Sequence, residues 1–467
     1  MVQTVLQYQR VADQTDRNIK INKNEACVQV LSKASKQRHA RSLSPTDGGR
    51  LVQMELEASA WSGVGAVPPD AIFGMKQKFT DDANADKVNL TVGSYATDEG
   101  KEYLLPTVRA AELAMATDPA LSHGYLKITG DDEFINLSLD LAFGADSPVR
   151  SAKRVAGVQT LSGTGALRLL ATFLARALPG KPLLVSRPTW GNHVKIFRAA
   201  GLEQRGYRYW EPDARALDLG GMLADLRAAP MGSIVLLHAC AHNPTGVDPT
   251  KAQWTSICDT MLARGQVAFF DMAYQGYATG DVDDDAWALR YFVKRGVDVL
   301  AAQSYAKNMG LYGERVGCAA IVCGSSAEAS AVRSNVAAIV RPMYSNPPRH
   351  GAAIVKRVLG SASSRAQWTT ELKQMAARIS AMRIALHTEL VSVLNTPGDW
   401  SHVLAQIGMF CYTGLSEVQV QHCIDVHHVY LLNSGRISVA GLNTGNVAQV
   451  ARAFDSAVRN CHPAARL

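Results

Sequence analysis

Residues 299–307 read Val-Leu-Ala-Ala-Gln-Ser-Tyr-Ala-Lys, a short apolar run that ends in a lysine. A run of this length, bounded by polar residues, predicts a buried strand. Ligands of open α/β sheets bind at the carboxyl ends of the strands. A lysine at such an end can lose its hydration, which lowers its pKa and makes the amine a nucleophile toward carbonyl groups. Most lysines are solvated surface charges, so Lys307 becomes a candidate only if its surroundings supply partners.

Similar apolar runs recur from residue 155 onward and alternate with longer helical patterns, which predicts a mostly parallel sheet in an α/β domain. The seven predicted strands are Val155–Leu161, Pro182–Ser186, Gly206–Trp210, Ile234–Ala239, Val267–Asp271, Val299–Tyr305 and Cys318–Cys323. The spacing of apolar residues predicts one long helix over Arg365–Leu394. Short strands and a terminal helix follow over Val403–Leu467, where we expect a second, smaller α+β domain.

The composition is that of a globular chain with a sizeable core. It has 467 residues, 47% of them apolar, and a mean hydropathy of -0.04, which suggests two or three domains. No stretch approaches the roughly 20 consecutive apolar residues of a membrane-spanning helix, so we expect no membrane partner. The eight cysteines are scattered without zinc-site spacing and are expected to be buried free thiols, with no structural metal.

Residues 1–57 are polar and lack a sustained apolar period, so we expect a poorly ordered extension. Residues 1–50 contain nine Lys and Arg and four Asp and Glu, an excess of five out of the net +7. A mitochondrial presequence is the alternative, although Asp13, Asp16 and Glu25 interrupt a segment type that is poor in acids. We expect a cytoplasmic protein, or a mitochondrial one if this segment is a presequence. Because the basic excess lies in a tail, we expect no nucleic-acid partner.

Two groups of small polar residues occupy positions where an anion could bind. Ser162-Gly163-Thr164-Gly165 follows the first predicted strand and precedes an amphipathic helix predicted over Ala166–Leu178. Free N–H groups, hydroxyl donors and the helix dipole at such a start favour a phosphate, although the same turn can be only a helix cap. Ser304 and Arg315 flank Lys307 and offer a second pair of phosphate ligands.

Other predicted strands end in side chains that suit a planar, charged ligand. Asp271 ends an apolar run, where a carboxylate needs a cationic partner such as a protonated pyridine nitrogen; a helix N-cap is the alternative. Asn243 precedes a turn-forming proline and could donate to a phenolate oxygen. Trp190 could stack on a flat ring, and His193 could support Asp271 from behind.

These motifs, in this order, resemble the class I pyridoxal-phosphate-dependent aminotransferases, and most closely their aspartate aminotransferase branch. The similarity covers roughly residues 60–465. It rests on Val92-Gly93-Ser94-Tyr95, Tyr125-Leu126, Ser162–Gly165, Pro188–His193, His238–Pro249, Asp271–Tyr277, Ser304–Gly317, Arg341–Pro348 and Asn433–Ser438. The resemblance implies the PLP-dependent transferase fold of type I. It also implies an N-terminal arm and part of a small domain over 58–102, a large cofactor-binding domain over 103–375 and the rest of the small domain over 376–467.

The matched motifs carry roles that the resemblance implies. Lys307 is implied to hold the cofactor covalently and to move the substrate's α-proton. Asp271 is implied to pair with the pyridine N–H, Asn243 and Tyr274 to donate to the phenolate oxygen, and Trp190 to stack on the ring. The residues implied to cradle the cofactor phosphate are Ser162, Gly163, Thr164, Ser304 and Arg315, with Tyr125 from the neighbouring subunit.

The resemblance also implies a homodimer with shared active sites and a ping-pong transfer of an amino group between L-aspartate and 2-oxoglutarate, giving oxaloacetate and L-glutamate. Arg436 is implied to bind the substrate α-carboxylate, and Arg341, lent by the partner subunit, the distal carboxylate. Gly93, Trp190 and Asn243 complete the implied substrate site. An aromatic amino acid aminotransferase with overlapping dicarboxylate activity is the alternative, since it shares nearly all of these motifs.

Two places depart from the pattern of the family. Ala96 and Thr97 stand where many relatives carry an arginine, and Lys127 replaces a usual proline. Neither place holds a residue with an implied chemical role. They bear on side-chain specificity and on the entrance of the site.

Overall fold

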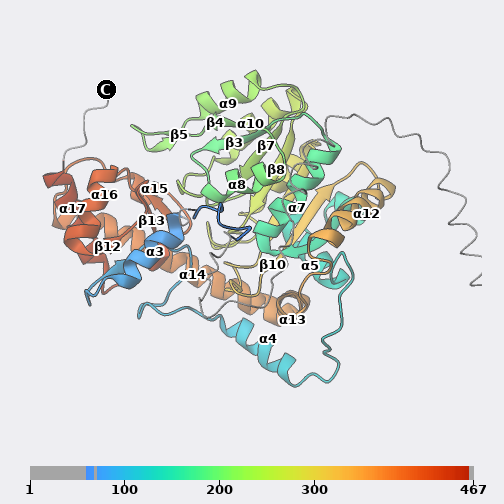
Figure 1. The fold of residues 1–467 in the computed structure, drawn as a ribbon, viewed down its shortest axis with the longest axis horizontal. Helices are drawn as coiled ribbons and strands as arrows, with labels where there is room; N and C mark the ends of the chain where they lie inside the picture. The colour runs from blue at the N-terminus through green and yellow to red at the C-terminus, as the bar shows by residue number, and fades with distance from the viewer. Residues whose placement is uncertain (1–58, 68–70, 462–467) are drawn as a thin grey trace, which may run out of the picture. The chain divides into compact units, whose positions relative to one another are not determined.

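The computed structural model describes residues 59–67 and 71–461 (Figure 1). The extension predicted over residues 1–57 therefore lies outside the described residues. The described residues 71–461 form one compact unit, and the described residues 59–67 belong to a separate one. The domain boundaries expected near residues 103 and 376 fall inside the larger unit and stay predictions.

A seven-stranded sheet forms the centre of the larger unit, in the order β2-β10-β9-β8-β7-β3-β4. Its strands are β2 (Val155–Leu161), β3 (Leu183–Arg187), β4 (Gln204–Arg208), β7 (Ile234–His238), β8 (Val267–Met272), β9 (Val299–Ser304) and β10 (Val316–Val322). β10 runs antiparallel to both of its neighbours, and the other pairs are parallel. The prediction of one large, mostly parallel sheet is confirmed.

The predicted strand ends differ from the observed ones most at β4 and β10. β4 was expected to run to Trp210, but this residue belongs to β5 (Trp210–Glu211), which forms a separate hairpin with β6 (Ala216–Leu217). β10 starts earlier than expected because Val316 pairs with Leu161 at the end of β2. Both differences arise from strand pairing, which a run of apolar residues does not specify.

Alternate residues of the strands face two layers of helices, as the two-residue period of a strand requires. On β8, Phe269 packs in the cluster formed with α7 (Ser162–Ala177), α8 (Gly191–Ala199) and α12 (Ser326–Met343). Phe270 packs in the opposite cluster. That cluster includes α5 (Asp132–Phe143), α10 (Lys251–Ala263), α11 (Trp287–Arg295) and α13 (His350–Gly360). Since both faces are covered, the central strands are apolar up to their carboxyl ends, where polar residues such as Asp271 and Ser304 follow.

The first and last described parts of the larger unit form a region beside the main sheet, which Figure 1 shows in blue and red. β1 (Val88–Asn89) pairs in parallel with β12 (Val429–Tyr430), and β11 (Phe410–Tyr412) pairs antiparallel with β13 (Arg436–Ser438). The helices of this region are α3 (Ala71–Asp81), α15 (His402–Ala405), α16 (Glu417–His427) and α17 (Val447–Asn460). This pairing brings residues more than 300 positions apart in the chain into one small sheet.

The long predicted helix is present as α14 (Ala362–Thr388). It begins three residues before the expected Arg365, because the side chain of Ser361 caps it by accepting from the Ser364 N–H. Its predicted last turn, Glu389–Val393, winds as a π-helix. The remaining helices are α4 (Pro106–Ala116), α6 (Pro148–Ser151) and α9 (Leu219–Ala228). None of the described helices is long and apolar enough to cross a bilayer.

The parallel register brings the polar strand ends to one edge of the sheet. His238 lies opposite Asp271, Asp271 opposite Ala302, and Ser304 opposite Gly317. α7 begins at Ser162, four residues before the expected start, because Ser162 takes a φ of 60° that turns the chain directly from β2 into the helix. The Ser-Gly-Thr-Gly motif is therefore the first turn of α7, with its N–H groups at the same edge.

The packing of α7 on the sheet gives a stability prediction. Leu170 is fully buried against the sheet, so Leu170→Ala should lower the free energy of unfolding by about 2–5 kcal/mol. Val426 on α16 is 57% exposed, and Val426→Ala should stay within about 0.5 kcal/mol of the parent. Urea denaturation at fixed protein concentration measures both. Equal losses in the two variants would contradict this packing.

Candidate active site

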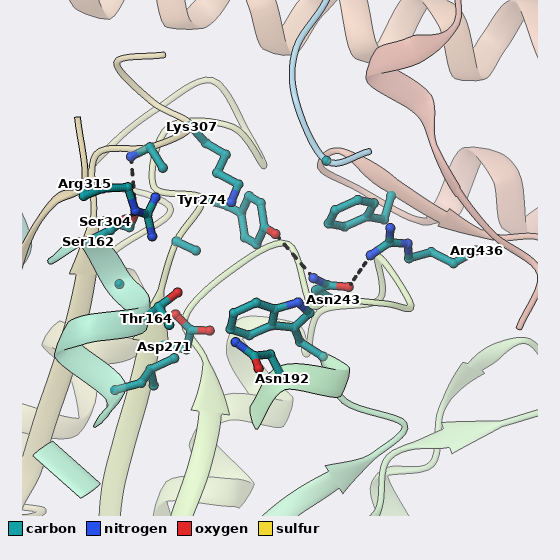
Figure 2. Close-up of a pocket in the computed structure, with 17 residues that line it drawn as sticks. Ser162, Thr164, Asn192, Asn243, Asp271, Tyr274, Ser304, Lys307, Arg315 and Arg436 are labelled. Atoms are coloured by element: carbon teal, nitrogen blue, oxygen red, sulfur yellow. Dashed lines mark hydrogen bonds between the residues drawn. The ribbon is translucent and has the colours of Figure 1, made fainter. Parts of the chain in front are cut away.

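A cavity of about 410 Å³ opens at the carboxyl edge of the main sheet, and Figure 2 shows the side chains around it. Twelve of the fourteen residues predicted for the site line it, and the other two, Tyr125 and Arg341, do not. Five further residues line the cavity without a role predicted from the sequence: Leu167, Asn192, Ala273, Ala306 and Phe410. The fold thus gathers residues from Gly93 to Arg436 in one place.

One end of the cavity has hydrogen-bond donors that suit an anion. The hydroxyl oxygens of Ser162 and Ser304 lie 3.0 Å apart, and the first turn of α7 supplies Gly163 and Thr164 beside them. Arg315 lines the same cavity and is held by a bond of 3.0 Å from its guanidinium to the Tyr312 carbonyl. Hydroxyls, a guanidinium and a helix N-terminus together suit a phosphate group.

Gly317 shows how closely the anion site is packed. A β-carbon at this position would lie 2.6 Å from the backbone carbon of Ser162 and 2.5 Å from the Gln303 carbonyl oxygen. Only glycine allows β10 to approach the start of α7 this closely. The position of the Ser162 hydroxyl therefore depends on the strand beside it.

Lys307 extends into the cavity from the loop after β9. Its amine lies 5.5 Å from the centre of the Tyr274 ring, and Figure 2 shows it pointing into the space between Arg315 and Tyr274. Loss of hydration lowers the pKa of Lys307 from 10.5 to about 8, while the charge of Asp271 acts in the opposite direction. A substantial fraction of the amine is therefore neutral, and nucleophilic, near physiological pH.

Asp271 is a buried carboxylate at the end of β8. Its Oδ2 lies 3.0 Å from His193 Nε2, and His193 Nδ1 lies 2.9 Å from the Thr189 hydroxyl, so the expected contact of His193 with Asp271 is present. Burial alone would raise the pKa of Asp271, but hydrogen bonding to His193 and nearby positive charge lower it below its usual value. Since this carboxylate is ionised, the proton lies on His193 Nε2 and the carboxylate accepts it in a hydrogen bond.

A chain of hydrogen bonds joins the side chains of Tyr274, Asn243 and Arg436 across the cavity (Figure 2). The Asn243 amide donates to the Tyr274 hydroxyl at 3.4 Å, and the Arg436 guanidinium donates to the Asn243 amide oxygen at 3.3 Å. A second bond of 2.6 Å runs from Arg436 to the Thr91 carbonyl. Three side chains from different parts of the fold are thus held in a fixed relation.

Arg436 is a buried cation that lacks an anionic partner among the described residues. It is 3% exposed, and burial lowers its pKa to about 10. Its Nε has no hydrogen-bond partner, and the Phe410 ring lies 4.3 Å from the guanidinium. Burial of an unpaired guanidinium is unfavourable unless a ligand completes it, and a carboxylate matches its fork of donors. The residue therefore fits the carboxylate group of a substrate.

Trp190 lines the cavity from the position just before α8. Its ring meets the His193 ring edge to face, at 5.2 Å, so the indole contacts the same histidine that bonds Asp271. Asn192 lies two residues further on, within the Pro188–His193 motif, and its position in that motif is a signal that could have identified it. Phe410 carried no such signal, since it is an ordinary apolar residue of a short strand.

Tyr125 and Arg341 lie outside the cavity of their own chain. Tyr125 is 92% exposed. Arg341, near the end of α12, donates to the Ser345 hydroxyl at 2.6 Å. Their expected roles in a neighbouring subunit stay predictions.

Comparison with known proteins identifies the family. The model of the family "Aminotransferase class I and II" matches residues 85–454. The chain belongs to this family. The cytoplasmic aspartate aminotransferase of rice (Oryza sativa subsp. japonica) is 50% identical over 401 residues, which are 86% of this chain and 98% of the relative.

Solved structures agree with this assignment. The aspartate aminotransferase from Saccharomyces cerevisiae cytoplasm is 44% identical, with a TM-score of 0.85, over 87% of this chain and 100% of that one. An aromatic-amino-acid aminotransferase from Burkholderia pseudomallei, covalently bound to pyridoxal phosphate, is 41% identical, with a TM-score of 0.83, over 86% of this chain and 100% of that one. The class I aminotransferase fold expected from the sequence is confirmed.

The environment of Lys307 gives a pH prediction. Only a neutral amine is acylated, and the pKa of about 8 means that acylation of Lys307 in the cofactor-free protein should rise through about pH 8. Asp271 raises this pKa, so Asp271→Asn should move the midpoint to lower pH. Mass spectrometry of the acylated peptide measures the midpoint, with the exposed Lys251 in the same digest as a control for reagent activity. A midpoint near that of an ordinary lysine, 10.5, would contradict the account.

Proposed function

We propose that this aminotransferase moves an amino group between L-aspartate and 2-oxoglutarate, giving oxaloacetate and L-glutamate, by a ping-pong mechanism. The observation that carries the proposal is a single cavity with an amine, a buried carboxylate and an unpaired guanidinium. These are Lys307, Asp271 and Arg436. The aspartate name of the relatives that are 44–50% identical supports this substrate.

The cofactor is pyridoxal 5'-phosphate, and the described residues fit its parts. The hydroxyls of Ser162 and Ser304, with Arg315 and the start of α7, suit the phosphate. The ionised Asp271 suits a protonated ring nitrogen, since a buried carboxylate needs a cationic partner. Asn243 and Tyr274 suit the phenolate oxygen, and the Trp190 indole offers a flat surface for the ring. When bound, the cofactor supplies an electron sink for negative charge at the substrate α-carbon.

Lys307 has the properties of a proton carrier at the substrate α-carbon. General bases are most effective when their pKa lies near the working pH, and burial brings the pKa of Lys307 to about 8. Its Nζ can therefore accept the α-proton and return it within the same cavity. Asp271 stays ionised during this transfer because His193 holds it in that form.

Two arginines are proposed to recognise the two carboxylates of the substrate. Arg436 has an unpartnered Nε among the described residues and faces the cavity, so it suits the α-carboxylate that every amino acid carries. Arg341 is proposed to serve the distal carboxylate from a second subunit, because it lies outside the cavity of its own chain. A homodimer with shared sites follows, in which Tyr125 reaches the cofactor phosphate of the partner.

A cytoplasmic location is part of the proposal. Relatives named for the cytoplasm, the mitochondrion and the chloroplast all match the chain. The interrupting acids in residues 1–57 favour the cytoplasm over a presequence.

Steady-state kinetics with a panel of amino acids tests the substrate. With 2-oxoglutarate as acceptor, aspartate should give a higher kcat/KM than tyrosine or phenylalanine. Arg341→Leu should lower kcat/KM for aspartate by about a hundredfold, since charge-assisted bonds to the distal carboxylate contribute on the order of 3 kcal/mol. Turnover of phenylalanine should change little. Aspartate turnover that survives Arg341→Leu, with aromatic substrates dominant, would favour the aromatic alternative.

Mixed dimers test whether the sites are shared. Lys307→Ala dimers should be inactive and Arg341→Leu dimers nearly so toward aspartate, but a hybrid dimer contains one site with both native residues. Random exchange of subunits should therefore restore about a quarter of the parent activity, since half of the dimers are hybrids with one complete site in two. If Arg341 acts in its own chain, mixing should restore nothing.

A further inference from the structure

Arg383, on α14, is a buried cation outside the lining of the cavity. It is 4% exposed; its guanidinium donates to three backbone carbonyls and also contacts the Cys411 thiol, and no carboxylate pairs with it among the described residues. The guanidinium donates to Val403 at 3.1 Å, to Gly408 at 2.9 Å and to Phe410 at 2.5 Å. An unpaired buried cation is costly to stability, so a residue that contributes only to the core would be better served by an apolar side chain.

The segment over residues 403–410, which Arg383 holds, connects two parts of the active site. The Ile407 N–H donates to the Gly246 carbonyl at 2.7 Å, and Gly246 lies three residues after Asn243. The Val439 N–H donates to the Met409 carbonyl at 2.7 Å, and Val439 follows directly after the strand that carries Arg436. The segment is therefore bonded to the loop of Asn243 and to the strand of Arg436, with Arg383 as its third attachment.

Phe410, at the end of this segment, touches the part of the cavity that receives a carboxylate. Its ring lies 4.3 Å from the Arg436 guanidinium and meets the Tyr274 ring edge to face at 5.9 Å. On another side, a β-carbon at Gly93 would lie 2.7 Å from the ring tip. The backbone carbonyl of this same residue accepts the shortest bond from Arg383. A shift of Phe410 must therefore alter the position of Arg436.

We propose that Arg383 is a positioning residue for substrate binding, which sets the guanidinium of Arg436 through the backbone and ring of Phe410. The inference rests on the proposed role of Arg436 as the α-carboxylate ligand. A guanidinium can reach three carbonyls because its five donors lie in one plane, whereas an ammonium group is a single point with a different reach. A positive charge at position 383 without the guanidinium fork, as in lysine, would therefore not hold all three carbonyls in place.

This role predicts a particular kinetic signature. Amino acids and oxo acids share the carboxylate next to the reacting carbon, so loss of the Arg383 fork should raise KM for both classes by a similar factor. An interaction that binds ground state and transition state alike changes KM with little change in kcat. The anion site of Ser162, Ser304 and Arg315 is separate, so affinity for the cofactor should stay within about twofold.

The experiment compares Arg383→Lys and Arg383→Met with Leu386→Ala in the holoenzyme. Leu386 is a fully buried residue one turn further along α14, so its truncation measures general loosening of the helix. Both Arg383 variants should raise KM for aspartate and for 2-oxoglutarate by about tenfold, the size of one charge-assisted hydrogen bond. Calorimetric binding of succinate, a dicarboxylate without an amino group, should weaken by the same factor. Leu386→Ala should lower the melting temperature and leave these values within about twofold.

Phe410→Leu gives a second measurement if Arg383→Met does not fold. It should raise KM in the same way, and adding Arg383→Lys to it should have less than the additive effect, because both act on one contact. Unchanged KM and succinate affinity in Arg383→Lys, or an equal rise in Leu386→Ala, would overturn the proposal. If the parent prefers an aromatic amino acid, aspartate specificity fails, but the same comparison with that substrate still tests Arg383, since its α-carboxylate is the same.

Discussion

The carboxylate of Asp271 lies buried at the end of β8, with His193 Nε2 at 3.0 Å. An isolated buried carboxylate would take up a proton, and the pKa of Asp271 is instead lowered because His193 and nearby positive charge stabilise the anion. This fixed negative charge sets the environment of the cavity. It favours the protonated form of Lys307. A cationic ring nitrogen would give this buried carboxylate a partner of opposite charge.

The rest of the fold places separate chain segments close to this carboxylate. The parallel register of β7, β8 and β9 brings three strand ends to one edge, and the antiparallel β10 brings the start of α7 against the end of β9. A different part of the chain supplies Arg436, held by Asn243, by Thr91 and by the ring of Phe410. One cavity therefore holds both an amine with a lowered pKa, Lys307, and a carboxylate with a lowered pKa, Asp271. This division of charge is what amino transfer needs, since one group must carry a proton while another stabilises a cationic ring.

The sequence predicted the sheet and the polar strand ends from strong local signals, whereas Arg436 and Gly93 were implied only by the resemblance to the family. Strands covered on both faces are continuous apolar runs, and the residues at their ends, such as Asp271 and Lys307, stand out as polar side chains after such runs. Strand pairing was less visible, since Trp210 joins a hairpin instead of β4. Phe410 and Arg383 could not be recognised, because their surroundings exist only after residues 403–410 fold onto α14. In the sequence, Arg383 is one of several charges on a long helix.

Reduction of the purified protein with borohydride, followed by digestion and mass spectrometry, tests the central claim most directly. Borohydride converts a bond between an amine and the cofactor aldehyde into a permanent one, so the modified residue can be located. The account predicts a pyridoxyl phosphate group on the peptide that contains Lys307, and its loss from that peptide in Lys307→Ala. The group on another lysine, or its absence from a protein that still turns over aspartate, would contradict the account.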